Sequence, residues 1–135
     1  MLTVMSIISL NLLLGITTLQ TYRTNASNSA ASTTVHDAII DVEGALNNVD
    51  QTYAAVSFDQ NTPGPLLDPT ARAALQTLAV PKNLAFHVDF DAACDNAACT
   101  QIFLQARHCF GNANQQYMRL GDGVSIYLDV AGGGC

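Results

Sequence analysis

The chain lacks tryptophan, has few basic residues and carries no charged side chain from Met1 to Tyr22. Five Lys and Arg stand against eleven Asp and Glu, which gives a formal net charge of −6 at pH 7. Binding to nucleic acid or to anionic lipid headgroups requires clustered basic residues, and the basic residues of this chain are scattered. The composition therefore argues against both functions.

The chain also lacks a CxxC pair, which most zinc-ribbon and zinc-finger sites contain. Four cysteines lie in the last third of the chain: Cys94, Cys99, Cys109 and Cys135. An even number of cysteines in a short chain with an export-like N-terminus indicates two disulfides formed in an oxidising compartment. A metal site is the less favoured alternative. With 135 residues, the chain has room for one domain.

No arrangement of catalytic side chains stands out around the three histidines, His36, His87 and His108. His87 is expected to point outward between two aspartates without a nucleophile. His108 adjoins Cys109, which cannot attack a substrate if it is disulfide-bonded. The group Asp89, Asp91 and Asp95 lacks the glycine and the terminal glutamate of an EF-hand loop. The sequon Asn25-Ala26-Ser27 is short enough to recur by chance. We predict no enzyme activity, no metal and no cofactor.

The chain does have a long apolar run at its N-terminus, LTVMSIISLNLLLGITTL over residues 2–19. About twenty helical residues cross a hydrocarbon core. The polar side chains in the run can bond to their own helix or to a neighbouring one: Ser6, Ser9, Asn11, Thr17 and Thr18. A cleavable signal would have a basic start and a small-residue cleavage site, and neither is present. We therefore expect a retained anchor, with a cleaved signal as the alternative.

A second helical pattern follows the apolar run. Apolar residues recur at steps of three and four: Val35, Ile39, Val42, Leu46, Val49 and Tyr53. No proline occurs before Pro63, so one helix is expected to continue to about residue 55. Residues 24–34 are small and polar, so two helices joined by a linker are the alternative. Gly15 to Thr24 has the lowest helix propensity.

The remaining residues predict a small α+β domain. Residues 57–68 are expected to be loop, because they contain Pro63, Gly64 and Pro65. Asp68 before Pro69 predicts a helix start, with the helix running to about Leu78.

The strand signals lie further along the chain. Residues 84–91 alternate as a strand, with Phe86, Val88 and Phe90 on one face. Asp95 and Asn96 are expected to cap a helix over Ala97 to Arg107. Residues 117–130 predict a hairpin that turns at Gly121-Asp122-Gly123. The expected fold is a long helix on a three-stranded antiparallel sheet, with segments 1–23, 24–56 and 57–135.

A charge-free apolar helix, an amphipathic continuation and a small disulfide-bonded domain resemble the type IV pilins. The segment FHVDFDAACDNAACTQIFLQA (86–106) is similar to the strand and cysteine-bearing helix of type IVb pilins. The resemblance implies a disulfide between Cys99 and Cys135, which leaves Cys94 for Cys109. It also implies that Met1 is the processed N-terminus. Met5 departs from the family, which normally has a glutamate there.

The resemblance implies a structural subunit of an extracellular filament, held in the inner membrane with a periplasmic head before assembly. Its partners would be copies of itself, the pilus assembly machinery and a prepilin peptidase, with no nucleic acid. The filament core would contain Leu2, Ile7, Ile8, Leu10, Leu12, Leu13, Leu14, Ile16 and Leu19. Helicity would be lost in the filament at Gly15, Thr17 and Thr18. The alternatives are a pseudopilin of a secretion or DNA-uptake system and a monomeric membrane-anchored periplasmic binding module.

Overall fold

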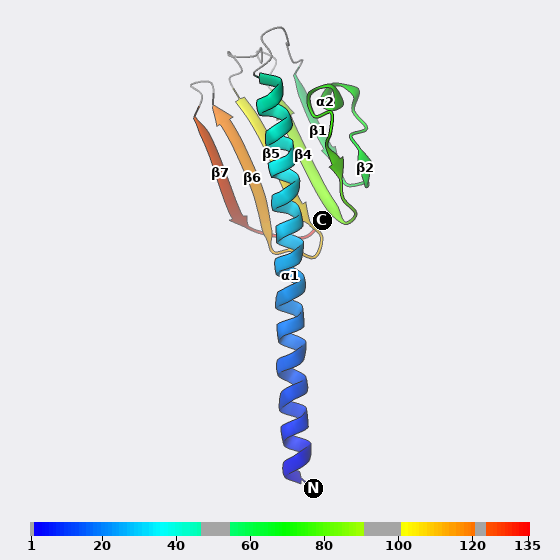
Figure 1. The fold of residues 1–135 in the computed structure, drawn as a ribbon, viewed down its shortest axis with the longest axis vertical. Coiled ribbons are helices and arrows are strands. Elements are labelled where there is room, and N and C mark those ends of the chain that lie inside the picture. The colour runs from blue at the N-terminus through cyan, green and yellow to red at the C-terminus, as the bar shows by residue number, and fades with distance from the viewer. Residues whose placement is uncertain (1, 47–54, 91–100, 121–123) are drawn as a thin grey trace.

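The computed structural model describes residues 2–46, 55–90, 101–120 and 124–135. Figure 1 shows one long helix whose C-terminal half lies on a sheet and whose N-terminal half projects beyond it. The elements in chain order are α1 (Leu2–Leu46), β1 (Val56–Gln60), β2 (Gly64–Pro65), α2 (Pro69–Ala74), β3 (Ala79–Val80), β4 (Leu84–Phe90), β5 (Gln101–His108), β6 (Ala113–Leu120) and β7 (Ser125–Ala131).

Helix α1 is unbroken over its 45 residues, which corresponds to a length of about 67 Å. The expected single helix is therefore present as far as Leu46, including the low-propensity segment from Gly15 to Thr24. The part of the prediction that extends from residue 47 to 54 lies outside the described residues.

The main sheet has five antiparallel strands in the order β1-β4-β5-β6-β7, and β2 pairs with β3 in a separate ribbon. The prediction of three strands was therefore wrong in number, although the sheet does pack one face against α1. The predicted hairpin is confirmed, with Tyr117 opposite Tyr127. Its turn at 121–123 lies outside the described residues.

Two segments differ in type from the prediction. Residues Val56–Gln60 form strand β1, so residues 57–60 of the predicted loop are strand, because the segment pairs in register with β4. Gln60 at its end is buried and donates to the backbone carbonyls of the turn that contains the prolines. Residues Gln101–His108 form strand β5, not helix. In β5 the buried residues Ile102, Leu104 and Ala106 alternate with more exposed ones, so the period is two.

Helix α2 begins as the sequence predicts and ends earlier. The Asp68 carboxylate accepts hydrogen bonds from the backbone N–H groups of Thr70 and Ala71, at 2.9 and 2.8 Å. These bonds satisfy two of the N–H groups that have no partner within the helix. The helix stops at Ala74, with Leu75 as its C-cap, and not at Leu78.

The described disulfide joins Cys109 to Cys135. Both pairings implied by the pilin resemblance are therefore wrong, because each one requires a sulfur that this bond already uses. Antiparallel pairing brings the end of β5, the start of β6 and the end of β7 to one end of the sheet. There Gly132 N–H donates to the Asn112 carbonyl at 3.0 Å. Cys94 and Cys99 lie outside the described residues.

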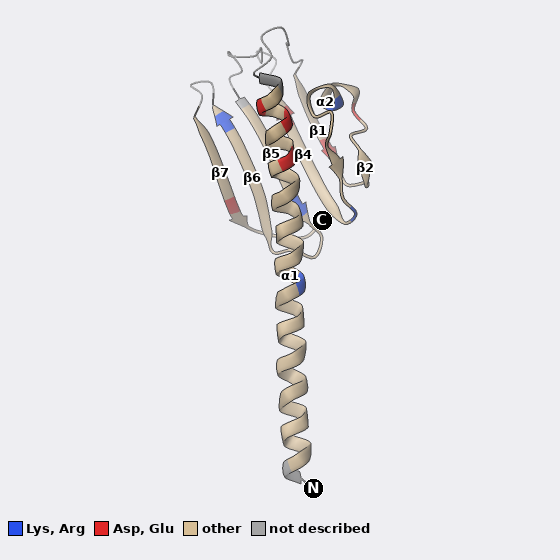
Figure 2. Cartoon of the chain, viewed as in Figure 1, with Lys and Arg blue, Asp and Glu red and all other residues tan. Residues whose placement is uncertain are grey.

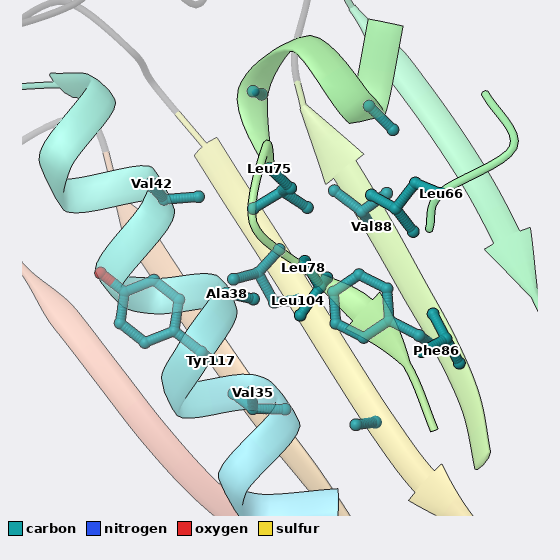
Figure 3. Close-up of a cluster of buried hydrophobic side chains, with 14 of the residues drawn as sticks. Val35, Ala38, Val42, Leu66, Leu75, Leu78, Phe86, Val88, Leu104 and Tyr117 are labelled. Atoms are coloured by element: carbon teal, nitrogen blue, oxygen red, sulfur yellow. The ribbon is translucent and has the colours of Figure 1, made fainter. Parts of the chain in front are cut away.

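The hydrophobic core lies between α1 and the sheet, with α2 closing one side (Figure 3). Helix α1 contributes Val35, Ala38 and Val42, each at most 3% exposed. Strands β4 and β5 contribute Phe86, Val88 and Leu104, which are equally buried. Because this core uses one face of α1, it determines which face of the helix remains outside.

Polar contacts fix the rotation of α1 on the sheet. Near its middle, Asn28 donates to the Asn112 side chain at 2.7 Å. Nearer its end, the Glu43 carboxylate accepts from Tyr117 Oη at 3.0 Å and from Arg119 Nη1 at 3.1 Å. These contacts lie several helical turns apart, so α1 cannot rotate on the sheet without breaking them.

Candidate self-association surface

The N-terminal half of α1 is bare on every side. Residues 4–23 are all exposed, and their aliphatic and methionine side chains remain 53–70% accessible. No other described part of the chain covers them. The segment is long and apolar enough to cross a membrane by length and composition. A charge-free apolar cylinder of this kind is stable only when lipid or another protein surface surrounds it.

The hydroxyl groups in this segment bond to the helix backbone. Ser9 donates to the Met5 carbonyl at 2.9 Å, and Thr18 to the Leu14 carbonyl at 2.6 Å. Thr17 bonds in the same way to Leu14. The expectation that these side chains can bond to their own carbonyls is therefore confirmed, and they add little cost to placing the helix in an apolar environment.

The charges of α1 are separated along its axis. In Figure 2, the blue of a basic residue lies on α1 just below the head, and the red of acidic residues lies nearer the C-terminal end of the helix. The basic residue is Arg23. Of the acidic residues, Asp41 accepts from the N–H and hydroxyl of Thr77, and Glu43 pairs with Arg119. The third, Asp37, is exposed and, like Arg23, makes no ion pair within the described part of the chain.

The exposed face of α1 continues from the bare segment along the head. The exposed residues recur at steps of three and four, with one step of seven from Thr33 to Ile40, on the side opposite the core. We call this face the outward stripe and define it by Ile8, Leu12, Gly15, Leu19, Tyr22, Ala26, Ser29, Thr33 and Ile40. Tyr22 and Ile40 are 73% and 69% exposed, which is high for large side chains beside a folded domain.

The structure places the predicted filament-core residues around the whole circumference of the bare segment. Leu2 belongs to α1, while its side chain and Met1 lie outside the described residues. Gly15, Thr17 and Thr18 are helical in this chain. Their loss of helicity was predicted for the assembled filament and stays a prediction. Sequence analysis missed the outward stripe, although its regular spacing was a usable signal.

A second apolar surface lies on the outer face of the sheet at its β7 edge. Ile126, Leu128 and Val130 alternate on that face and are 37–46% exposed. The register places Met118 of β6 opposite Ile126, so the patch extends onto the next strand. Strand β7 is also an edge strand, with one side of its backbone unpaired in the described sheet.

Within the described part of the chain, the three histidines set aside in the sequence lie apart from one another. His36 stacks on Tyr127, His87 Nδ1 lies 3.0 Å from Asp59 Oδ1, and His108 tilts against Phe110. Asp89 is exposed, whereas Asp91 and Asp95 lie outside the described residues. The described residues contain no group of three or more metal-ligating side chains.

A shallow hollow beside His87 is lined by Asp59, Gln105 and Arg107 among others. It contains a histidine–carboxylate pair but no serine or cysteine nucleophile among its lining residues. Asn25 of the sequon is exposed, while Ser27 is packed toward the sheet in the middle of α1. Neither the hollow beside His87 nor the sequon offers a surface as large as that of the apolar helix.

Comparison of this chain with models of known families, with characterised proteins and with solved structures finds no match. The functional interpretation consequently rests on the bare apolar helix, the head that holds it and the residues of the outward stripe.

Proposed function

We propose that this chain is a structural subunit of a type IV pilus-like extracellular filament, which assembles by packing of its N-terminal helices. The observation that carries the proposal is the continuity of α1. One unbroken helix joins a bare apolar segment to a disulfide-bonded head. The same element can therefore anchor the chain in a membrane and later occupy the core of a polymer.

The energetics support this exchange of surroundings. In lipid, the backbone hydrogen bonds of α1 are satisfied within the helix, so the subunit is stable before assembly. In a filament, the apolar side chains would contact other copies in place of lipid. Relative to exposure in water, each square ångström of apolar surface buried between copies is favourable by about 25 cal/mol. Relative to lipid, the gain comes from close packing of the helices and from hydrogen bonds between them. Repeating one heterologous contact generates an open helical polymer.

Met5 requires a different first contact from that of most pilins. The family's glutamate at this place pairs with the terminal amine of a neighbour, and the bare segment of this chain has no acidic residue. We therefore propose that recognition between copies uses side chains elsewhere along α1. A minor or initiating subunit is one role compatible with this departure.

The deciding experiment is cryo-electron microscopy of filaments sheared from the surface of source cells. We expect density for this chain in a helical lattice, with α1 in the core. If the chain is missing from the filaments and is extracted only as a detergent-bound monomer, a membrane-anchored periplasmic module replaces the proposal. Short periplasmic polymers without surface filaments would indicate a pseudopilin.

A further inference from the structure

Three of the five basic residues lie at one end of the folded head, although they are far apart in the sequence. Arg23 is in α1 just below the head, Lys82 is in the turn between β3 and β4, and Arg107 is next to the last residue of β5. The Cys109 N–H donates to the Asn83 carbonyl at 2.8 Å, which places the two turns side by side. Figure 2 shows blue on α1 and at the adjacent ends of β4 and β5, all toward the bare segment.

We call this part of the molecule the proximal end of the head and define it by Lys82, Asn83 and residues 107–112. Lys82, Arg107 and the nearby Arg23 are exposed, and none of them makes an ion pair within the described part of the chain. The scatter of basic residues in the sequence argued against a contact with anionic lipid, and the fold gathers three of them where that argument no longer applies.

The acidic residues of the neighbouring strands lie further from the proximal end. Asp59 of β1 is opposite His87, with which it pairs at 3.0 Å, and Asp129 of β7 is opposite Gln115. Among the described residues, the proximal end therefore has an excess of positive charge, in a chain whose formal net charge is −6. A local basic surface on an acidic protein favours an anionic partner.

An aromatic side chain is exposed at the same end. Phe110, in the turn between β5 and β6, is 67% exposed, and its ring tilts against that of His108 at 5.8 Å between centroids. The turn is held to α1, because the Asn112 N–H donates to Asn28 Oδ1 at 3.1 Å. Aromatic rings beside basic side chains are typical of surfaces that enter the boundary between lipid headgroups and acyl chains.

The position of the proximal end along α1 matches the layers of a bilayer. Residues 2–22 span about 30 Å, which is the thickness of the hydrocarbon core. Tyr22, which is 73% exposed, and Arg23 would then lie at the edge of this core. Asn28, which holds the turn, follows Arg23 by about 7.5 Å along the axis. Because each headgroup layer is about 5–8 Å thick, the proximal end would meet its outer surface.

We propose that the proximal end of the head docks on the bilayer surface while the chain is anchored in a membrane. Lys82, Arg107 and Arg23 bind the phosphates of anionic phospholipids, and Phe110 inserts among the headgroups. Lipid is the occupant, and not a protein, because α1 sets this end at the height of the headgroup layer. The inference rests on the proposed function, since it requires α1 to span the membrane before assembly.

The absence of tryptophan from the chain allows a single fluorescent reporter. Phe110→Trp is reconstituted as the full chain, at low density, in vesicles of equal parts phosphatidylglycerol and phosphatidylcholine. The quencher is phosphatidylcholine spin-labelled near the top of its acyl chain. Ile126→Trp is the matched control, because Ile126 is apolar, 37% exposed and near the other end of the sheet. We expect at least twofold stronger quenching for Phe110→Trp, and equal or weaker quenching overturns the docking.

The dependence on charge identifies the lipid headgroup as the ligand. In Phe110→Trp, replacing phosphatidylglycerol by phosphatidylcholine should lower the quenching at least twofold, and so should the added pair Lys82→Gln/Arg107→Gln. The control pair Ser57→Glu/Gln116→Glu changes the net charge equally but lies further along the sheet, so it should leave the quenching unchanged. Quenching that responds to neither the lipid charge nor the basic residues overturns the headgroup contact and indicates another occupant, such as a second copy.

Extraction of the same vesicles with alkaline carbonate separates this inference from the proposed function. A chain that stays in the bilayer while its reporter at position 110 is not quenched overturns the docking and leaves the proposed function intact. A chain that carbonate releases contradicts the membrane anchor itself, and with it both proposals.

Discussion

At the residue scale, Tyr117 links the sheet to the far end of α1. Its hydroxyl donates to Glu43 and lies 3.1 Å from Ser125 Oγ. Burial raises the pKa of Tyr117 above its ordinary value of 10.0, the hydrogen bond with Ser125 opposes the rise, and Glu43 adds to it. The folded head therefore favours the neutral phenol.

We predict that Tyr117 makes the head less stable above pH 10. Because the pKa is higher in the folded state, its contribution is fully present below pH 10 and is lost as the pH rises through the folded pKa. In Tyr117→Phe, the fall in unfolding free energy above pH 10 should be smaller than in the unmodified chain. Urea unfolding followed by circular dichroism measures this difference, and equal slopes in both proteins would refute the assignment.

Gly133 shows how a single missing side chain permits the disulfide. A Cβ at this position would overlap the Gly111 carbonyl. We predict that Gly133→Ala lowers the unfolding free energy by about 1–3 kcal/mol and slows formation of the Cys109–Cys135 bond.

Gly44→Ala is the matched control, because no described atom outside its own stretch of helix lies within 4 Å of the Cβ position and the residue is helical. It should be neutral or stabilising by up to about 1 kcal/mol. Peptide mapping under non-reducing conditions measures the bond in both variants, and normal bonding in Gly133→Ala would show that the tail can shift.

Some of these residue roles were predictable from the sequence and others were not. Asp68 was identified as an N-cap because a cap depends on residues two and three places away. The Glu43–Tyr117 contact joins residues 74 apart, and no local pattern encodes that separation. The disulfide was mispaired because the pairing was taken from the pilin resemblance. Cys109 and Cys135 meet because pairing of β5 with β6 and of β6 with β7 brings the ends of β5 and β7 to the same end of the sheet.

At the element scale, β5 illustrates an ambiguity in short apolar segments. Ile102, Phe103 and Ala106 satisfy a helical period, while Ile102, Leu104 and Ala106 satisfy a strand period. Pairing on both sides, with β4 and β6, decides for the strand because it satisfies the backbone of a central position in the sheet. Strand β4 was recognised from sequence because its alternation has no helical counterpart.

The two faces of the sheet give a matched pair of leucines. Leu104 is fully buried under α1, whereas Leu128 is 46% exposed on the outer face. We predict that Leu104→Ala lowers the unfolding free energy of the head by about 2–5 kcal/mol. Leu128→Ala should lower it by less than about 1 kcal/mol.

Chemical denaturation of both leucine variants in detergent gives the comparison. A larger effect at Leu128 than at Leu104 would mean that the outer face, and not the helix-covered face, holds the core. If the outer face is also a contact between copies, Leu128→Ala should reduce filament yield without altering the denaturation midpoint of the monomer.

At the scale of the whole molecule, the head and the bare segment are separable. The first buried side chain of α1 is Ser27, and the core residues follow it. We predict that a chain lacking residues 1–24 is a folded monomer without detergent and retains the Cys109–Cys135 bond. Sedimentation and thiol titration test this, and aggregation of the truncated chain would show that the apolar segment is needed for the head to fold.

The order and type of the N-terminal elements could be predicted from the sequence more fully than the contacts between elements. Charge absence and helical spacing predicted the apolar segment and its helical continuation, because both signals are local and repeated. The orientation of the outward stripe required the structure, since it depends on which face of α1 the sheet covers. The sheet in turn depends on pairings between β1 and β4 that span the α2 region.

The position of α1 at the start of the chain has a consequence for folding kinetics. Its core residues Val35, Ala38 and Val42 lie in one cluster with residues of β5 and β6, which come much later in the chain. Such a high contact order slows folding, because a long loop must close before the contacts form. During that delay the proposed membrane anchor would keep the apolar segment out of water, so that only the core residues of the head would be exposed to aggregation. The proposed anchor would thereby limit aggregation of the chain while the head folds.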